Sequence, residues 1–270
     1  MTQRPSRPVR VLASALAAGA LLTTAACSDG DDSGADGADT TRISSSPLAQ
    51  ESPAALTPAG ARAALVTEGD LEGDWDQVKD AADWRDSLLV GKVDVADFLT
   101  AKTNAADCQK FLDALYSDDL LGKPSGASAL TGFEEGDSRL LYQVAAYDRK
   151  ALSGSLAWLK SLPVTCDQFT ATDSSGGKRT VQVTERSLPK EGDARQGLRV
   201  TVQGTSGGAA TTLTLDVAAL RVGTDAITIT NGGLDGVDGD STDTAAELGT
   251  GRLEQVQAGR TPSANPGDTD

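Results

Sequence analysis

Apolar and polar residues alternate with a period of two through the second half of the chain. The alternating segments are 179–185, 198–202, 212–217 and 226–230. Turn residues separate them, as at Ser206-Gly207-Gly208 and Gly223-Thr224-Asp225. This pattern predicts β-strands with one buried face. Val and Leu would fill that face, and Thr, Arg and Gln would face water on the other, as in antiparallel sheets.

The first half of the chain carries helical patterns instead. Thr57 and Pro58 precede segment 59–66, which predicts a short helix capped by Thr57 with Pro58 in its first turn. A second helix is predicted over 105–115, with Asn104 as its cap. Its apolar residues recur at i, i+3, i+4 and i+7 and form one buried stripe. They are Cys108, Phe111, Leu112 and Leu115.

The middle of the chain reads strand, helix, strand. A strand is predicted over 139–147, then a helix that Asp148 caps and Pro163 ends, then a strand over 164–170. A last helix is predicted over 243–257. Together these elements predict an α+β domain, in which an antiparallel sheet of four to six strands carries helices packed on one face.

Composition excludes several chemistries. The 270 residues include no histidine, three cysteines and an excess of acids that gives a net charge of −15. Without histidine, no Ser-His-Asp or Cys-His nucleophile and no histidine zinc site can be built within this chain. Three cysteines cannot form a Cys₄ site. The negative charge argues against nucleic acid as a partner. No cofactor or catalytic residue is therefore expected.

The first 27 residues resemble an export signal. Its basic start is formed by Arg4, Arg7 and Arg10. The apolar run over 11–22 is shorter than the about 20 residues that span a bilayer as a helix. The run leads into Thr24-Ala25-Ala26-Cys27, which resembles the lipobox of bacterial lipoproteins. That resemblance implies cleavage of signal peptide 1–26 and a lipid on Cys27. The alternative is an ordinary secreted protein cleaved after Ala26.

A tether follows the lipid. Segment 27–56 is predicted to be disordered, since it begins with the acidic stretch 28–37, which has almost no apolar residues to bury. The folded domain is predicted over 57–257, and 258–270 is predicted to be a disordered tail. Removal of three arginines with the signal peptide leaves 21 basic against 39 acidic residues, a charge of −18. Anionic headgroups repel such a body, so the lipid has to provide the attachment to the membrane.

Cys108 and Cys166 are left within the exported domain. Two cysteines in an exported domain predict one disulfide. Closing a loop of 58 residues is worth about 4 kcal/mol in the chain-entropy model. The alternative is a pair of buried free thiols.

Three acidic or glycine-rich segments suggest sites but match no motif. The carboxylates of 235–243 lack the glycine that an EF-hand needs, so an Asp/Gly turn is favoured. Glu134 and Glu135 could be a glycosidase pair, although adjacent acids arise by chance in so acidic a chain. Segment 174–178 lacks the Gly-Lys-Ser/Thr ending of a phosphate loop and is better explained as a turn.

Two tryptophans in a polar stretch, Trp75 and Trp84, could line a ligand groove. The favoured alternative is that they cover a sheet edge or a helix seam.

Several motifs occur together: a lipobox, an acidic tether, a cysteine on a helix and a second cysteine after the next helix. Three short motifs accompany them, namely Asp70-Leu71-x-Gly73-x-Trp75, Tyr147-Asp148 at a helix start and Arg221-Val222-Gly223 at a turn. Over about 57–232 the chain thus resembles actinobacterial lipoproteins and the extracellular sensor domain of PknH-type mycobacterial serine/threonine kinases. The resemblance implies a helix-and-sheet domain with an open cleft for an unidentified ligand. Those kinases have two disulfides, whereas this chain can form one.

The leading hypothesis is a non-catalytic, lipid-anchored protein of the outer face of the cell membrane. Its partners would be the membrane, through Cys27, and a small ligand or an envelope protein. One alternative is a carrier of lipids or glycolipids, which requires an apolar cavity of several hundred Å³. Another is an envelope hydrolase, which requires two carboxylates across a cleft. A scaffold without any ligand is the last alternative.

We predict that Cys27→Ser releases the protein into the medium, because the modified cysteine is the expected attachment to the membrane. The measurement is fractionation of cells and medium, with the unchanged chain as control. Retention of the variant in the membrane fraction after a high-salt wash would contradict the lipoprotein hypothesis.

Overall fold

The computed structural model describes residues 55–71, 73–85, 88–89, 93–98, 105–174, 176–206, 208–234 and 236–262. All of them belong to one compact unit, Gln50–Asp270. The predicted signal peptide, Cys27, the tether up to residue 54 and the tail beyond residue 262 lie outside the described residues. None of the described helices is long and apolar enough to cross a membrane.

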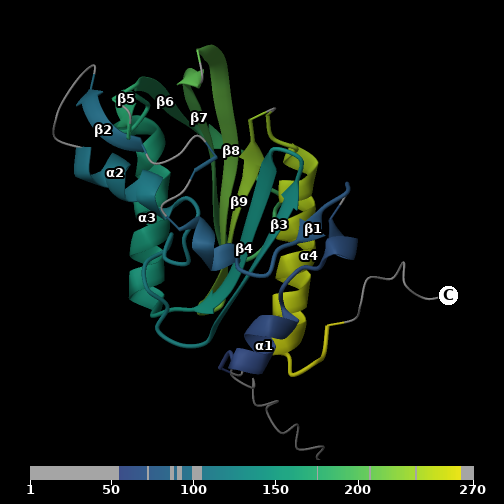
Figure 1. Cartoon of the computed structure of the whole chain (residues 1–270). Helices are drawn as coiled ribbons and strands as arrows, with labels where there is room; N and C mark the ends of the chain where they lie inside the picture. The colour runs from purple at the N-terminus through teal and green to yellow at the C-terminus, as the bar shows by residue number, and fades with distance from the viewer. Residues whose placement is uncertain are drawn as a thin grey trace, which may run out of the picture. The chain divides into compact units, whose positions relative to one another are not determined.

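The described strands form one antiparallel sheet of nine strands, in the order β1-β3-β4-β9-β8-β7-β6-β5-β2 (Figure 1). The strands are β1 (Asp76–Gln77), β2 (Val93–Phe98), β3 (Ser128–Glu135), β4 (Ser138–Ala146), β5 (Gln168–Asp173), β6 (Lys178–Arg186), β7 (Ala194–Ser206), β8 (Ala209–Val222) and β9 (Asp225–Gly233). The α-helices are α1 (Pro58–Ala63), α2 (Ala105–Ala114), α3 (Arg149–Thr165) and α4 (Gly239–Gln257). Two short 3₁₀ helices, Glu68–Asp70 and Ala81–Trp84, complete the described elements.

The α+β class with an antiparallel sheet is confirmed, but the predicted four to six strands are too few. The edge strands β1 and β2 are short and were not predicted. Strand β3 mixes Gly, Thr and Glu among its apolar residues, so it has no clear alternation, yet it pairs with β4 along its whole length.

The predicted end of α3 at Pro163 is also wrong. A proline in the last turn removes one helical hydrogen bond, but the Cys166 N–H still donates to the Leu162 carbonyl at 2.7 Å. Helix α3 therefore continues to Thr165, and β5 begins at Gln168 rather than at 164.

Helices cover both faces of the sheet, whereas one face was predicted. Helix α3 packs on β6 and β7 from one side, and α1 and α4 pack on β3, β4, β8 and β9 from the other (Figure 1). In β8, Val217 and Ala219 belong to the α3-side core, and Ala218 and Leu220 belong to the α4-side core. Because both faces of this strand are buried, its second half has no polar alternation.

The helix caps predicted at Thr57 and Asp148 are confirmed, whereas the predicted cap Asn104 lies outside the described residues. The Thr57 hydroxyl accepts from the Gly60 N–H at 3.0 Å, and the Asp148 carboxylate accepts from the Lys150 and Ala151 N–H groups, each at 3.0 Å. The stripe of α2 is buried as predicted. These features are local, and sequence spacing alone determines them.

Cys108 and Cys166 form a disulfide, as predicted, with their Cα atoms 5.7 Å apart. The bond ties α2 to the carboxyl end of α3, and both residues are fully buried. It therefore joins two helices that contact different strands of the sheet, α2 at β2 and α3 at β6 and β7.

Both tryptophans are buried, which confirms that they pack within the cores rather than line a groove. Trp84 lies over β3 on the α3 side, at Gly132. A Cβ atom at Gly132 would approach the Trp84 ring to 2.8 Å, so glycine is needed for this close contact. Trp75 belongs to the opposite core and donates to the Ser241 hydroxyl at 3.4 Å.

We predict that Cys108→Ala/Cys166→Ala lowers the free energy of unfolding by about 4 kcal/mol, because the open chain gains the entropy of a loop of 58 residues. Urea denaturation without reductant measures the difference. Thiol titration of the unfolded, unreduced chain with Cys27→Ser should find no free thiol. One or two free thiols in that titration would show that the disulfide does not form.

Candidate functional site

Helix α4 covers only part of its side of the sheet. Strands β5, β6 and β7 and the first half of β8 bury Val, Leu and Phe on the α3 side and expose alternate residues on the other. Cross-strand pairing arranges these residues in two rows. One row is Gln168, Gln182, Thr201 and Thr214, and the next is Thr170, Thr180, Gln203 and Thr212. We call these eight exposed or half-buried residues the Thr/Gln ladder.

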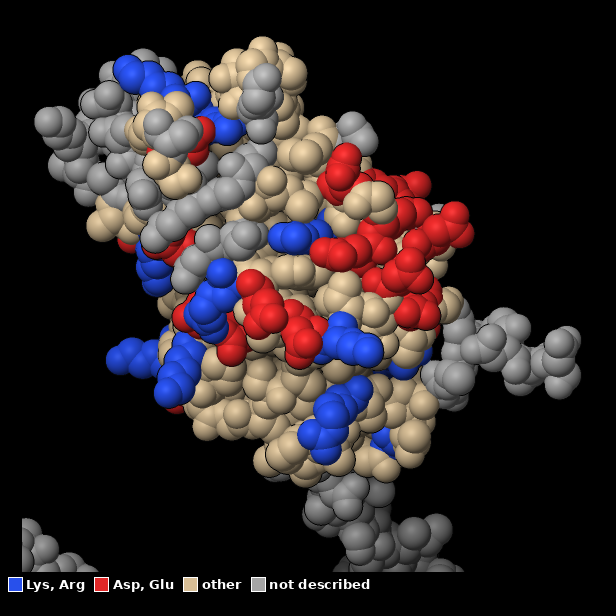
Figure 2. Space-filling view, viewed as in Figure 1, with Lys and Arg blue, Asp and Glu red and all other residues tan. Residues whose placement is uncertain are grey.

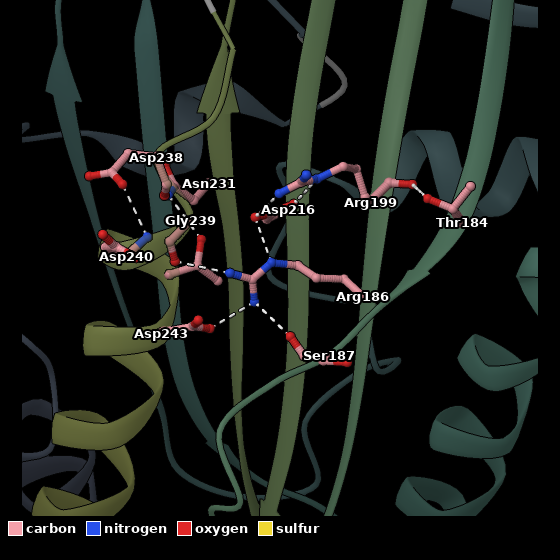
Figure 3. Close-up of polar contacts among 11 residues, drawn as sticks. Thr184, Arg186, Ser187, Arg199, Asp216, Asn231, Asp238, Gly239, Asp240 and Asp243 are labelled. Atoms are coloured by element: carbon pink, nitrogen blue, oxygen red, sulfur yellow. Dashed lines mark hydrogen bonds and ion pairs between the residues drawn. The ribbon is translucent and has the colours of Figure 1, made fainter.

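The third row of the same face is charged. It runs from Thr184 through Arg199 to Asp216, which borders the part of the sheet under α4. The Asp216 side chain is fully buried and accepts from Arg199 Nε at 2.8 Å and Nη2 at 3.0 Å. Its Oδ2, which accepts from Arg199 Nη2, also pairs with Arg186 Nε at 2.7 Å (Figure 3). Two guanidinium groups thus share one buried carboxylate.

Arg186 extends this row to helix α4. Its Nη1 donates to Asp243 Oδ1 at 2.7 Å, and its Nη2 donates to the Gly239 carbonyl at 2.9 Å (Figure 3). Residues Arg186, Arg199, Asp216 and Asp243 are called the arginine clamp below. The clamp joins β6, β7 and β8 to the first turns of α4, so it determines where the covered part of the sheet ends.

Arg199 differs from Arg186 in its exposure. The Arg199 side chain is 43% exposed, against 11% for Arg186. Hydrogen bonding to Asp216 raises the pKa of Arg199 above its ordinary value, so the group stays charged. The Asp216 carboxylate also fixes its orientation. Arg199 therefore presents a charged, preoriented guanidinium beside the Thr/Gln ladder.

A hollow of about 410 Å³ adjoins the clamp where β6 ends and β7 begins. Arg186, Leu188, Arg195 and Gln196 contribute to its lining. Arg195 is exposed and stands on β7 two positions before Gly197, which pairs with Arg186. Pleat alternation places Arg195 on the same face as Arg199.

The ladder contains no acid, although the chain has 39 of them. Acidic side chains gather instead over β1 and the β3–β4 turn (Figure 2). There Glu135 accepts from the Asp74 N–H, and Asp76 pairs with Glu134 across the strands. The uncharged ladder is thus separate from the acidic part of the surface.

The acidic segment 235–243 begins helix α4. Asp238 is its N-cap and accepts from the Asp240 N–H at 3.0 Å and the Ser241 hydroxyl at 2.8 Å. Asp243 belongs to the clamp, and Asp235 lies outside the described residues. Among the residues that the structure describes, no three metal-binding side chains of Cys, His, Asp or Glu converge.

The other sequence candidates have ordinary partners. Glu134 pairs with Arg139 at 3.1 Å, and Glu135 is bonded to the backbone as above. The predicted turn over 174–178 joins β5 to β6 and is confirmed, with Asp173 accepting from the Gly177 N–H at 2.8 Å. Cys27 lies outside the described residues.

Among the described residues, three carboxylates are buried, one at the end of the first 3₁₀ helix and two on strands, and each is bonded. Asp70 accepts from Arg252 Nη2 at 2.7 and 2.6 Å, and Asp216 is held by the clamp. Burial raises the pKa of Asp225, and a hydrogen bond from Gln257 opposes that rise. These three carboxylates are therefore engaged in structural contacts.

The sequence predicted that Thr, Arg and Gln face water on the alternating strands, and this is confirmed for the Thr and Gln residues of 180–184 and for Arg199 and Thr201. It is wrong for Arg179, which is buried beside Asp173, and for Thr228 and Thr230 of β9, which are buried between the two cores. Asp216 and Arg186 were not predicted as interacting residues. One signal was present: Asp216 is the single acid in the run from Leu213 to Leu220. An acid in a buried strand position requires cationic partners.

No family model matches the chain, and no curated protein matches it. Among solved structures, the extracellular domain of PknH from Mycobacterium tuberculosis is similar, with a TM-score of 0.44 and 11% sequence identity. The match covers 76% of this chain and 98% of that one. The sequence motifs resemble the same kind of domain. A similarity at this level assigns neither a ligand nor site residues to the present chain.

We predict that Asp216→Asn lowers the free energy of unfolding by about 3 kcal/mol, because it leaves two guanidinium groups without their shared counter-charge in a buried position. Urea denaturation measures the loss. Asp243→Asn is the matched control: its side chain is 39% exposed, and the expected loss is below about 1 kcal/mol. Equal losses of unfolding free energy for the two variants would show that burial does not increase the contribution of Asp216 to stability.

Proposed function

We propose that this protein is a non-catalytic binding protein, held at the outer face of the cell membrane by a lipid on Cys27, whose domain binds its ligand on the Thr/Gln ladder. The supporting observation is the face of β5 to β8 that no described helix covers. On the same side of the sheet, α1 and α4 bury the neighbouring strands. The boundary between the two regions is fixed by the arginine clamp.

The ladder offers hydrogen-bonding groups at regular spacing. Neighbouring strands lie about 4.8 Å apart, and alternate residues of one strand lie about 7 Å apart. Each Thr hydroxyl can donate and accept, and each Gln amide can do both as well. A grid of this kind on a rigid sheet binds without covalent chemistry, and it loses little side-chain entropy because Thr has one restricted rotor.

The expected anchor agrees with such a role. A flexible tether of about 28 residues would have a root-mean-square reach of about 30 Å. The acidic domain would be repelled from anionic headgroups. The binding face would thus stay close to the membrane but accessible to molecules of the envelope.

The carrier alternative has less support. Four hollows in the described part of the chain have volumes of about 40 to 540 Å³. Charged side chains, among them Arg85, Lys110 and Asp113, line the largest of these. An acyl chain needs an apolar lining. The hydrolase alternative has less support because the buried carboxylates described above already have partners.

The test blocks the ladder without assuming any ligand. In the mature chain with Cys27→Ser, a cysteine is introduced by Gln182→Cys and modified with a polyethylene glycol maleimide. Modification should abolish co-sedimentation of the protein with delipidated, insoluble bacterial envelope, because the polymer covers the centre of the ladder.

The matched control is Lys160→Cys with the same modification. Lys160 is exposed on α3, on the opposite side of the sheet, and should tolerate the polymer without loss of binding. If the envelope fails to retain even the unmodified chain, or if both modified variants bind equally well, the proposal is wrong.

A further inference from the structure

We infer that the ligand of the Thr/Gln ladder is an anionic, hydroxyl-rich linear polymer, with carboxylate or phosphate groups as its charges. This inference rests on the proposed function and adds the chemical class of the ligand. It is carried by the cations that stand at both ends of the ladder on a protein that is otherwise strongly acidic.

The cations are placed by strand register. Lys178 precedes Thr180 by two residues on β6 and is exposed. Arg199 precedes Thr201 by two residues on β7, which runs antiparallel to β6. The two rows of the ladder therefore lie between Arg199 at one end and Lys178 at the other. Exposed Arg195 lies beyond Arg199 on the same face.

The separation of these cations indicates a long ligand. Thr180 pairs with Gln203, so the same antiparallel register places Lys178 beside Thr205 of β7. Thr205 is six residues beyond Arg199 on that strand. At about 3.4 Å per residue, the two charges are about 20 Å apart. A small anion could contact one of them only. A chain with repeated negative groups can contact both and place its hydroxyl groups over the ladder between them.

The local charge supports an anion. The arginine clamp is neutral by itself, since Arg186 and Arg199 balance Asp216 and Asp243. Lys178 and Arg195 then give this face of β5 to β8 two extra positive charges. The whole chain carries −15. Exposed acids on these strands, such as Glu185, alternate onto the other face.

Arg199 contributes a ready-made contact. The Nε and Nη2 of Arg199 donate to Asp216, and the Nη1 of Arg199 has no partner among the described residues. The guanidinium is already oriented, so a ligand anion would order it at little entropic cost.

The test compares matched polymers on the mature chain with Cys27→Ser. The probes are carboxymethyl-dextran, dextran phosphate, neutral dextran and poly-glutamate, and binding is measured by calorimetry. One or both anionic dextrans should bind at least about tenfold more tightly than neutral dextran and poly-glutamate, and added salt should weaken that binding. The tighter of the two anionic dextrans identifies the preferred anion.

Variants at one position separate charge from packing. Gln182→Glu should weaken binding of the anionic dextran about tenfold, and Gln182→Lys should strengthen it, because the two changes place opposite charges in the ladder. Lys178→Gln/Arg195→Gln should also weaken it, whereas Lys150→Gln/Lys160→Gln on α3 should not. All four cations are exposed, so these changes leave the cores intact.

Equal binding of neutral and anionic dextran, or equal weakening by both changes at Gln182, would overturn the inference about charge. Poly-glutamate bound as tightly as the anionic dextrans would overturn the requirement for hydroxyl groups. In either case, envelope binding that is lost on modification of Gln182→Cys would leave the proposed function standing. Failure of that block, whatever the polymers do, contradicts the proposed function itself.

Discussion

A buried carboxylate with two arginine partners lies at the line where the sheet changes from covered to open. Burial of an unpaired Asp216 would cost several kcal/mol, so its two ion pairs are a condition for the fold. One of these arginines also bonds to the Gly239 carbonyl and to Asp243 at the start of α4. Helix α4 therefore cannot slide over β6 and β7 without breaking the clamp. The face of β5 to β7 stays open because the clamp holds α4 over the neighbouring strands.

The same line separates two kinds of strand. On β6, and on β7 through the rows of the ladder, apolar residues alternate with Thr, Gln and Arg, because only the α3 side is buried. In β9 every residue is buried, since α4 and the opposite core cover both of its faces. Alternation in the sequence was thus a sound guide to the one-sided strands. Alternation predicted helices on one face of the sheet only, because it was read from the one-sided strands. The same sheet also contains strands that are buried on both faces.

Features that depend on a few neighbouring residues could be predicted from the sequence. The caps at Thr57 and Asp148, the stripe of α2 and the turn over 174–178 are of this kind. The Cys108–Cys166 pair could be predicted by counting cysteines in an exported domain. The short edge strands β1 and β2 could not, because pairing with β3 and β5 rather than their own pattern makes them strands. Pro163 misled because its effect depends on its place within the last helical turn.

The ladder lies between these cases. Five of its eight members lie in the alternating segments and were expected to face water, namely Thr180, Gln182, Thr201, Thr212 and Thr214. Its two rows appear only once the register of four strands is known. Register brings together residues that are up to 46 positions apart, such as Gln168 and Thr214, and no local pattern contains that information. Asp216 shows the same limit. Its position in an apolar run signals a burial problem, but the identity of the cations that solve it follows from cross-strand pairing.

The acidic residues elsewhere on the domain increase the selectivity of the open face for its ligand. A negatively charged polymer is repelled by most of the surface, including the acids over β1 and the β3–β4 turn (Figure 2). Only a face with local positive charge allows close approach, so the overall field would guide the polymer to the ladder and weaken adsorption elsewhere. Uniformly basic proteins bind anionic polymers without preference for place or partner. An acidic body with one neutral, cation-flanked face has lower total attraction but requires the ligand to match both the spacing of the cations and the hydroxyl grid between them.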